Sequence, residues 1–487
     1  MRHRVILSAC LVAATVTIGL AATNDVRLID AVRARNVERV RALLAERVNV
    51  NATQADGATA LHWAVHLDDA SLIDTLIRAG ARADVADDTG ATPLYLACMN
   101  RNADAVSRLL TAGANPNAAL LSGESVLMTC ARAGNATAVR ALLARGAAVN
   151  AKESTHEQTA LMWAAAQSHP QVVQALLERG ADVGARSRQY TQMVTSEVTQ
   201  RAGRETLNYP VPRGGMTAVL FAARSGDADS TRLLVAAGAD VNDALPDGSS
   251  ALIIAAHSGH RQAAIALLEK GAEPNADRAG YTALHAAVLR SDVELVKALL
   301  ARGADPNAPI TKGTPVRRNS QDFELPKTLL GATSYALAAK FLEPAIMQAL
   351  AAGGADTRWP MNDGATPLMA AAGMGIVAPA QDEKRGTDRR GLAIIDGGLV
   401  EPESQVLDTV TTALTLGSDL EAANPSGETA LHIASAQGYE TVVRALAERG
   451  ANLNARNARG QTPLGALVAR KARPAMIELL RKLGAGM

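Results

Sequence analysis

Two pairs of histidines are spaced as metal ligands could be. His62 and His66 stand four residues apart, so both would lie on one face of a helix. His257 and His260 stand three residues apart. A zinc site needs three or four protein ligands, and no third ligand lies near the first pair. We therefore expect these histidines to be structural, and the sequence predicts no metal site.

Asp88, Thr89 and Gly90 copy the triplet that carries the catalytic carboxylates of aspartic proteases. That chemistry needs two carboxylates that share a proton, and the chain has no second triplet. The chain also lacks a nucleophile elbow, a His-Glu-x-x-His helix and a phosphate-binding Gly-Lys-Ser/Thr loop. The sequence therefore predicts a protein that is not an enzyme, with no catalytic residues and no cofactor.

The residues around these motifs form a repeating phrase. A glycine followed by Thr-Ala-Leu-His or a close variant recurs, and its first three copies begin 33 residues apart at Gly57, Gly90 and Gly123. Later copies contain Thr282–His285, Thr366–Met369, Thr429–His432 and Thr462–Leu464. A fixed period of this length predicts a solenoid of stacked units, none of which can bury its apolar face alone.

Each unit is expected to contain two short helices and a turn-rich finger. Thr59 is a good N-cap for a first helix, and proline follows the equivalent threonine in several units, where its missing N–H is harmless. Leu72, Ile73 and Leu76 give the second helix an apolar stripe, which Gly80 ends. Both helices are too short to be stable alone, so they must pack on neighbours.

This pattern resembles the ankyrin repeat family. The family phrase Gly-x-Thr-Pro-Leu-His-x-Ala-Ala is matched repeatedly, and Gly238–Asn242 and Gly303–Asn307 match its closing phrase. The resemblance implies an all-α ankyrin-repeat solenoid of about twelve helix-turn-helix units with β-hairpin-like fingers. The units begin near residues 25, 57, 90, 123, 157, 215, 248, 280, 331, 364, 427 and 460.

Three insertions interrupt the period, near residues 188–213, 309–330 and 376–405. The first two fall where a finger is expected, so we expect them to extend loops. The third separates the two helices of its unit. Long loops in compact arrays are usually functional or disordered.

The N-terminus has the pattern of a secretory signal peptide. Residues 2–4 are basic, residues 5–20 are uncharged and mostly apolar, and small residues follow at Ala21 and Ala22. We expect residues 1–22 to be a signal peptide and residues 23–487 to be the solenoid of an exported, bacterial protein, periplasmic or secreted. An uncleaved anchor and a lipoprotein modified at Cys10 are the alternatives.

Cysteine content and charge add two expectations. Cys98 and Cys130 occupy small-residue positions in neighbouring units. Helices of such units pack ~8–10 Å apart, farther than the usual Cα separation in a disulfide, so we expect two buried thiols, with a disulfide as the alternative. The net charge of +1 without a basic block argues against nucleic-acid binding.

In the ankyrin family, partners contact finger residues and the residues that follow the Ala-Ala pair. The resemblance therefore implies a protein-binding surface on the concave face and fingers, with this set of candidate residues: His66, Met99, Arg132, Met216, Arg224, His257, Tyr281, Leu289 and Lys340. The anchors are expected to be Trp163, Met216, Phe221 and Tyr281, since a few buried side chains carry most binding energy.

The sequence thus predicts a non-catalytic scaffold of the cell envelope that is monomeric and binds a protein, with neither nucleic acid nor, after signal cleavage, a membrane as partner. Two alternatives belong to other classes. One is an enzyme or metal-dependent regulator whose site lies in the inserted loops. The other is a secreted effector that binds a host protein.

Overall fold

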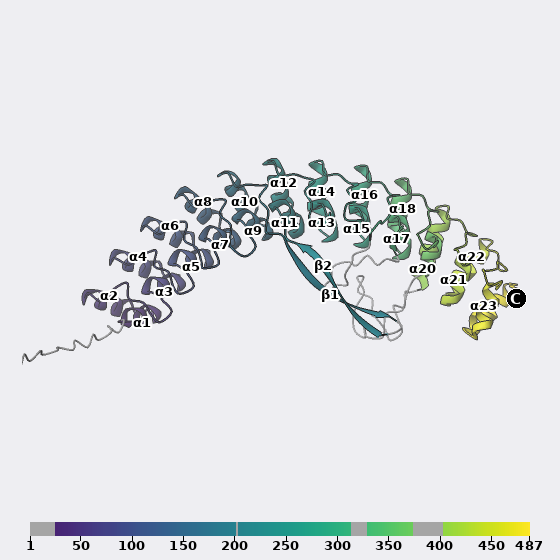
Figure 1. Ribbon diagram of the computed structural model, residues 1–487, viewed down its shortest axis with the longest axis horizontal. Coiled ribbons are helices and arrows are strands. Elements are labelled where there is room, and N and C mark those ends of the chain that lie inside the picture. The colour runs from purple at the N-terminus through teal and green to yellow at the C-terminus, as the bar shows by residue number, and fades with distance from the viewer. Residues whose placement is uncertain (1–24, 201–202, 313–328, 374–402) are drawn as a thin grey trace, which may run out of the picture. The chain divides into compact units, whose positions relative to one another are not determined.

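The computed structural model describes residues 25–200, 203–312, 329–373 and 403–487 (Figure 1). Within them the chain forms 24 helices in twelve consecutive pairs, which confirms the all-helical solenoid of twelve units. The chain divides into two compact units, Met1–Leu121 and Ser122–Met487.

Each pair consists of a first helix and a second helix. The first helices are α1 Arg27–Arg33, α3 Ala60–His66, α5 Pro93–Met99, α7 Val126–Ala133, α9 Ala160–Ala166, α11 Ala218–Ser225, α13 Ala251–His257, α15 Ala283–Leu289, α17 Ser334–Lys340, α19 Pro367–Ala371, α21 Ala430–Gln437 and α23 Pro463–Arg470. The second helices are α2 Val37–Ala45, α4 Ala70–Arg78, α6 Ala103–Thr111, α8 Ala136–Ala144, α10 Pro170–Leu177, α12 Ala228–Ala236, α14 Arg261–Glu269, α16 Val293–Ala301, α18 Pro344–Ala352, α20 Glu403–Thr415, α22 Glu440–Glu448 and α24 Pro474–Lys482.

The repeated threonine starts the first helices, as the sequence predicts. Thr92 accepts a hydrogen bond from the Tyr95 backbone amide, and Pro93 occupies the first helical position. Where histidine ends the phrase, the threonine and the histidine form a capping box: the Thr59 amide donates to His62 Nδ1 at 3.1 Å. The phrase is therefore a helix-start signal.

The core lies between the two helices of each pair and between neighbouring pairs. Leu61, Ala64, Leu72 and Leu76 are fully buried, and the same positions are apolar in most of the other repeats, with Ser230 of α12 as an exception. In the compact unit Ser122–Met487, the first helices α11, α13, α15 and α17 lie side by side, and so do the second helices α12, α14, α16 and α18 (Figure 1). Small residues at the centres of the first helices permit this close packing.

The fingers join neighbouring pairs through backbone hydrogen bonds. The Ser154 amide donates to the Ser122 carbonyl at 2.9 Å, and the Ala458 amide donates to the Ser426 carbonyl at 2.8 Å. The buried histidines of the repeat add a side-chain link: His432 Nε2 lies 3.3 Å from the Gln461 carbonyl oxygen. These fingers are therefore fixed to the next ones, which places the starts of the first helices that follow them.

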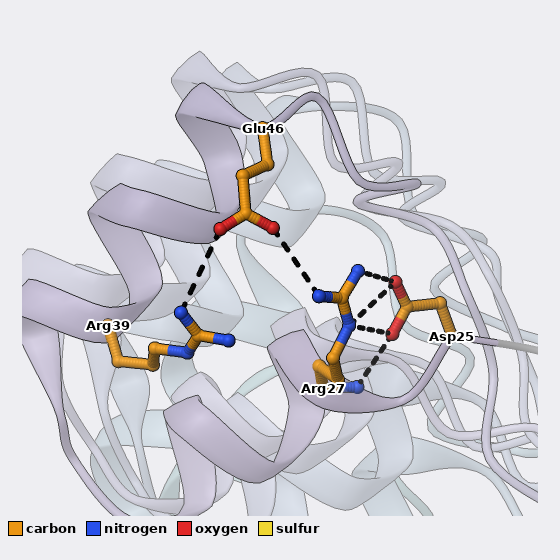
Figure 2. Close-up of polar contacts among 4 residues, drawn as sticks. All are labelled: Asp25, Arg27, Arg39 and Glu46. Carbon is orange, nitrogen blue, oxygen red and sulfur yellow. Dashed lines mark hydrogen bonds and ion pairs between the residues drawn. The ribbon is translucent and has the colours of Figure 1, made fainter.

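An exposed ion-pair network closes the first helix pair (Figure 2). Arg27 donates to both oxygens of Asp25, with the shortest contact at 2.6 Å, and its other nitrogen lies 3.4 Å from Glu46. Arg39 approaches the second oxygen of Glu46 at 3.8 Å. The hydrogen bond from Arg27 lowers the pKa of Asp25 below its usual value. Because these groups are solvated, the network contributes little stability but gives the end of the array a polar surface.

The first insertion is a long β-hairpin rather than a loop. Strand β1 (Tyr190–Gln200) pairs antiparallel with β2 (Gly203–Arg213), from Tyr190 opposite Arg213 to Gln200 opposite Gly203. At its base the Gly215 amide donates to the Ser187 carbonyl at 3.2 Å, and the Met216 amide donates to Ser187 Oγ at 3.0 Å. The array therefore continues across the insertion without a break.

Several predicted segments lie outside the described residues. They are the signal peptide at residues 1–22 and most of the insertions at residues 309–330 and 376–405. The third insertion does fall between α19 and α20, the two helices of one pair. In the described part of the chain, no helix is both long enough and apolar enough to cross a membrane.

The cysteines require a correction. Cys98 in α5 and Cys130 in α7 are fully buried, as expected, but both are disulfide-bonded. The expectation of two free thiols is therefore wrong. It relied on the distance between helix axes, whereas buried side chains approach one another more closely than the axes that carry them.

Candidate protein-binding surface

The candidate surface is built by one position of each unit, at the end of the first helix. Within the compact unit Ser122–Met487, we call the residues at this position from α7 to α17 the first-helix row. They are Arg132, Ala166, Arg224, His257, Leu289 and Lys340. Successive first helices pack against each other, so the row follows the stacking direction. Because each first helix from α7 to α17 begins after a threonine or serine at the N-cap position, the row positions repeat with the same geometry.

Arg132 is held in place by two neighbours. Its guanidinium lies 3.0 Å from Glu124, a finger carboxylate whose side chain is 13% exposed, and 4.8 Å above the ring of Trp163 in α9. The Trp163 indole N–H donates to Gln158 at 2.7 Å. Stacking and pairing together fix the orientation of a side chain that is still 41% exposed. Arg132 is therefore an accessible cation whose orientation is set before any partner arrives.

Arg224 repeats part of this arrangement in α11. Its guanidinium lies 5.1 Å from the ring of Phe221, one helical turn earlier, and its side chain is exposed. Ala166 lies between Arg132 and Arg224 in the row, so a small side chain separates two oriented arginines.

The other half of the row is less exposed. His257 Nδ1 lies 3.3 Å from the Tyr281 hydroxyl, and Arg290 donates to the His257 carbonyl at 2.5 Å. Burial lowers the pKa of Lys340, although Asp363 partly opposes this effect. These two side chains are half-buried, so they contribute polarity at the row without projecting from it.

The compact unit Met1–Leu121 contains its own arginine stacked on a tryptophan. Arg33 lies 4.6 Å from the ring of Trp63, and the Trp63 indole donates to Gln54 at 3.1 Å. His66 is exposed and meets Trp63 edge-on with ring centroids 5.5 Å apart. Met99 is 50% exposed at the end of α5. Both predicted residues of this unit are thus accessible.

Three predicted contact residues are buried, and we remove them from the surface. Met216, Tyr281 and Leu289 are 7%, 8% and 6% exposed. Met216 and Tyr281 immediately precede the threonine caps of α11 and α15. The predicted anchor Phe221 is buried as well, at 5%. Of the four predicted anchors, only Trp163 retains partial exposure.

The histidines considered as metal ligands have structural contacts. His62 Nδ1 completes the Thr59 capping box, and its Nε2 lies 3.1 Å from the Ala91 carbonyl oxygen. Burial lowers the pKa of His62 below its usual value. In the described ranges, no group of three or more His, Cys, Asp or Glu side chains is arranged to hold a metal ion.

Sequence reasoning did not connect Gln158 to the surface, and it did not pair the finger residue Glu124 with Arg132. Both are finger residues, and both act on a row residue or on the aromatic beneath it. The signal in the sequence is the recurrence of Gln54 with Trp63 and of Gln158 with Trp163, in which a finger glutamine precedes a tryptophan at the same helical position.

Comparison with protein families agrees with this geometry. A family described as "Ankyrin repeats (3 copies)" matches residues 28–120, 103–187, 210–310 and 403–487. A second, described as "Ankyrin repeats (many copies)", matches residues 161–235. Together these matches span well over half of the chain. The chain therefore belongs to the ankyrin repeat family.

Proposed function

We propose that this protein is an exported, non-catalytic scaffold that binds another protein through the first-helix row and the adjoining fingers. Ankyrin repeats generally mediate protein–protein interactions and are generally non-catalytic. The observation that carries the proposal is the Glu124–Arg132–Trp163 cluster. It presents an arginine and a tryptophan, the residue types enriched at binding hot spots, in a fixed orientation.

We further propose that the protein works in the cell envelope of a bacterium, in the periplasm or after secretion. The signal-peptide pattern of residues 1–22 supports this location. The oxidised cysteines support it too, because disulfides persist in oxidising compartments. The first helix begins at Arg27, so cleavage after Ala21 or Ala22 would leave every described element intact.

Affinity capture from the native envelope fraction tests the binding surface. The bait is the chain from Thr23, and the row variant carries Arg132→Glu, Arg224→Glu and Lys340→Glu. The matched control carries Arg140→Glu, Lys297→Glu and Arg444→Glu, which make the same charge change at exposed positions on second helices. Circular dichroism confirms that all three proteins are folded.

We expect a partner that the wild type and the control retain and that the row variant loses. If both variants lost the partner equally, the loss would be explained by the change in net charge and not by the row. A partner retained by the row variant would place the interface elsewhere.

A further inference from the structure

The hairpin of the first insertion is a sheet of only two strands. β1 and β2 have 11 residues each, and among the described elements each strand pairs only with the other. A two-stranded sheet is marginally stable in water, and each of its outer edges presents a row of backbone donors and acceptors. Whether such an edge can accept another strand depends on the residues at its outward-facing positions.

Two prolines show which backbone groups of the hairpin point outward. Pro210 and Pro212 lie opposite Met193 and Thr191. Proline has no N–H to donate, so it must occupy positions whose backbone groups face away from the opposite strand. Both residues of an antiparallel pair share this property, so Thr191 and Met193 also direct their N–H and C=O groups outward. The outward positions of β1 are therefore every second residue from Thr191 to Thr199.

The two edges of the hairpin differ in what blocks them. β2 lacks two outward donors, at Pro210 and Pro212, and contains three charged residues. β1 contains no proline, so it keeps every outward N–H, and its one charged residue is Glu197. Prolines and charges are the devices with which proteins protect an edge strand. The edge of β1 is therefore the open edge of the hairpin.

We infer that the edge of β1 pairs antiparallel with the same edge of a second copy of this chain. The outward positions are symmetric about Thr195, and a two-fold axis at that residue pairs Thr191 with Thr199 of the second copy. Every outward donor then meets an acceptor, which gives about ten backbone hydrogen bonds. Glu197 lies opposite Met193 of the second copy and not opposite its own charge, so like charges do not face each other.

The same geometry limits the assembly to two chains. Because the pairing is antiparallel, the Tyr190 ends of the two hairpins lie at opposite ends of a four-stranded sheet, roughly 34 Å apart. Both outer edges of that sheet are β2, where Pro210 and Pro212 interrupt further pairing. A closed dimer is therefore expected, and it would stabilise a hairpin that is marginal alone. The sequence predicts a monomer, but it also predicts a loop here instead of a hairpin.

Sedimentation equilibrium of the chain from Thr23 tests the pairing. Thr195→Pro removes an outward donor at the two-fold axis and leaves the bonds between β1 and β2 in place. Asn208→Pro is the matched control, because Asn208 lies opposite Thr195 and its N–H faces the other edge. We expect a wild-type dimer, a dissociation constant at least about tenfold higher for Thr195→Pro, and a change below about twofold for the control. Circular dichroism verifies that both variants keep their helices.

Cysteine cross-linking tests the register. The chain from Thr23 contains only Cys98 and Cys130, and both are already oxidised. A hydrogen-bonded pair across two strands places its Cα atoms about 5.5 Å apart, which is within disulfide range. Thr195→Cys should therefore form a covalent dimer under mild oxidation. Thr199→Cys should not, because the two copies of this position lie roughly 27 Å apart in the proposed register.

Several results would overturn the inference. A dimer that survives Thr195→Pro, or that both proline variants weaken equally, would place the contact elsewhere. Cross-linking through Thr199→Cys and not through Thr195→Cys would refute the register. A wild type that stays monomeric at every concentration would refute the second copy. If Thr195→Pro then also lost a protein captured from the envelope, the edge would belong to a strand of that protein. The first-helix row takes no part in these experiments, so the proposed function is tested separately.

Discussion

At the scale of single residues, the histidine of the repeat phrase has a structural role with a chemical consequence. His62, His285 and His432 are buried at the start of their helices. The Nδ1 atom of each accepts a hydrogen bond from the backbone amide of the capping threonine. For His285, the donor is the Thr282 amide at 3.1 Å. That contact requires Nδ1 to be unprotonated. Burial lowers the pKa of His285 from its usual value to about 4, and it lowers the pKa of His62 and His432 as well.

Acid is therefore expected to destabilise the array. A depressed folded-state pKa means that the unfolded chain binds protons first, so the contribution of His285 is present above pH 6.5 and declines as the pH falls toward about 4. The decline amounts to up to about 3 kcal/mol for this residue. Thermal melts between pH 7.5 and 4.5 should show a smaller acid loss for His285→Gln than for the wild type, because glutamine can close the capping box but cannot titrate.

His66→Gln is the matched control, since His66 is exposed and outside the capping box. Its acid loss should equal that of the wild type. An unchanged acid loss in His285→Gln would show that the buried histidine does not govern the pH response.

At the scale of elements, the hairpin is joined to the array by a buried polar clamp. Asp243 is 5% exposed, forms an ion pair with Arg186 and accepts from the Thr217 hydroxyl at 2.5 Å. Arg186 also donates to the Gly215 carbonyl at 2.8 Å. These contacts connect both ends of the insertion to the cap of α11, so they set the position at which the hairpin leaves the array.

Removing the clamp carboxylate should destabilise this region. Asp243→Ala leaves Thr217 and Arg186 without their buried acceptor, which costs about 1–3 kcal/mol. Asp229→Ala, which removes a 75% exposed carboxylate from the Arg232 pair, should change stability by less than about 1 kcal/mol. Urea unfolding monitored by circular dichroism makes the comparison. Equal losses of stability in Asp243→Ala and Asp229→Ala would show that the contacts of Asp243 do not stabilise this region.

Gly214, at the hairpin base, offers a sharper comparison. Its φ is +74°, and a Cβ placed there would lie 1.8 Å from the Arg188 carbonyl oxygen. Gly238 has a similar φ of +96° with no atom within 4 Å of its Cβ position. Gly238→Ala should therefore cost roughly 1 kcal/mol from backbone strain alone, and Gly214→Ala should cost more because the backbone must also shift.

The readout for both glycine variants is the midpoint of thermal unfolding. A variant of Gly214 as stable as the variant of Gly238 would mean that the hairpin base adjusts without penalty.

At the scale of the whole molecule, stability is local. Within each compact unit the helix pairs contact the pairs beside them, so the free energy of folding of that unit is approximately a sum of pair and interface terms. Long arrays of this kind lose two-state behaviour. The end pairs matter because they cover the apolar faces of their neighbours with polar surfaces.

Deleting residues 459–487 should expose the apolar side of α21, which packs against α23. We expect increased binding of a hydrophobic dye, a lower melting midpoint and a tendency to aggregate. Arg481→Ala/Lys482→Ala keeps both terminal helices and removes only surface charge, so it should behave almost like the wild type. A soluble truncated chain with an unchanged melting midpoint would contradict a capping role for α23 and α24.

The sequence by itself determined the family, the number of repeats and the signals that start and end the helices, because caps, prolines, glycines and apolar spacing are local signals. Thr92, Pro93 and Gly80 could be interpreted without any knowledge of their neighbours. It also identified Arg132 and Arg224 as surface residues, since their positions in the repeat are defined by counting.

Only the tertiary structure decided which candidate side chains are accessible and what holds them. Met216 and Tyr281 are polarisable or amphipathic residues that suit either a core or an interface, and their burial depends on the neighbouring helix. The disulfide-bonded state of Cys98 and Cys130, the hairpin register and the Glu124–Arg132–Trp163 cluster likewise join residues that no local signal relates. Contacts between units form through packing in three dimensions, whereas helix signals act within a few residues of one another.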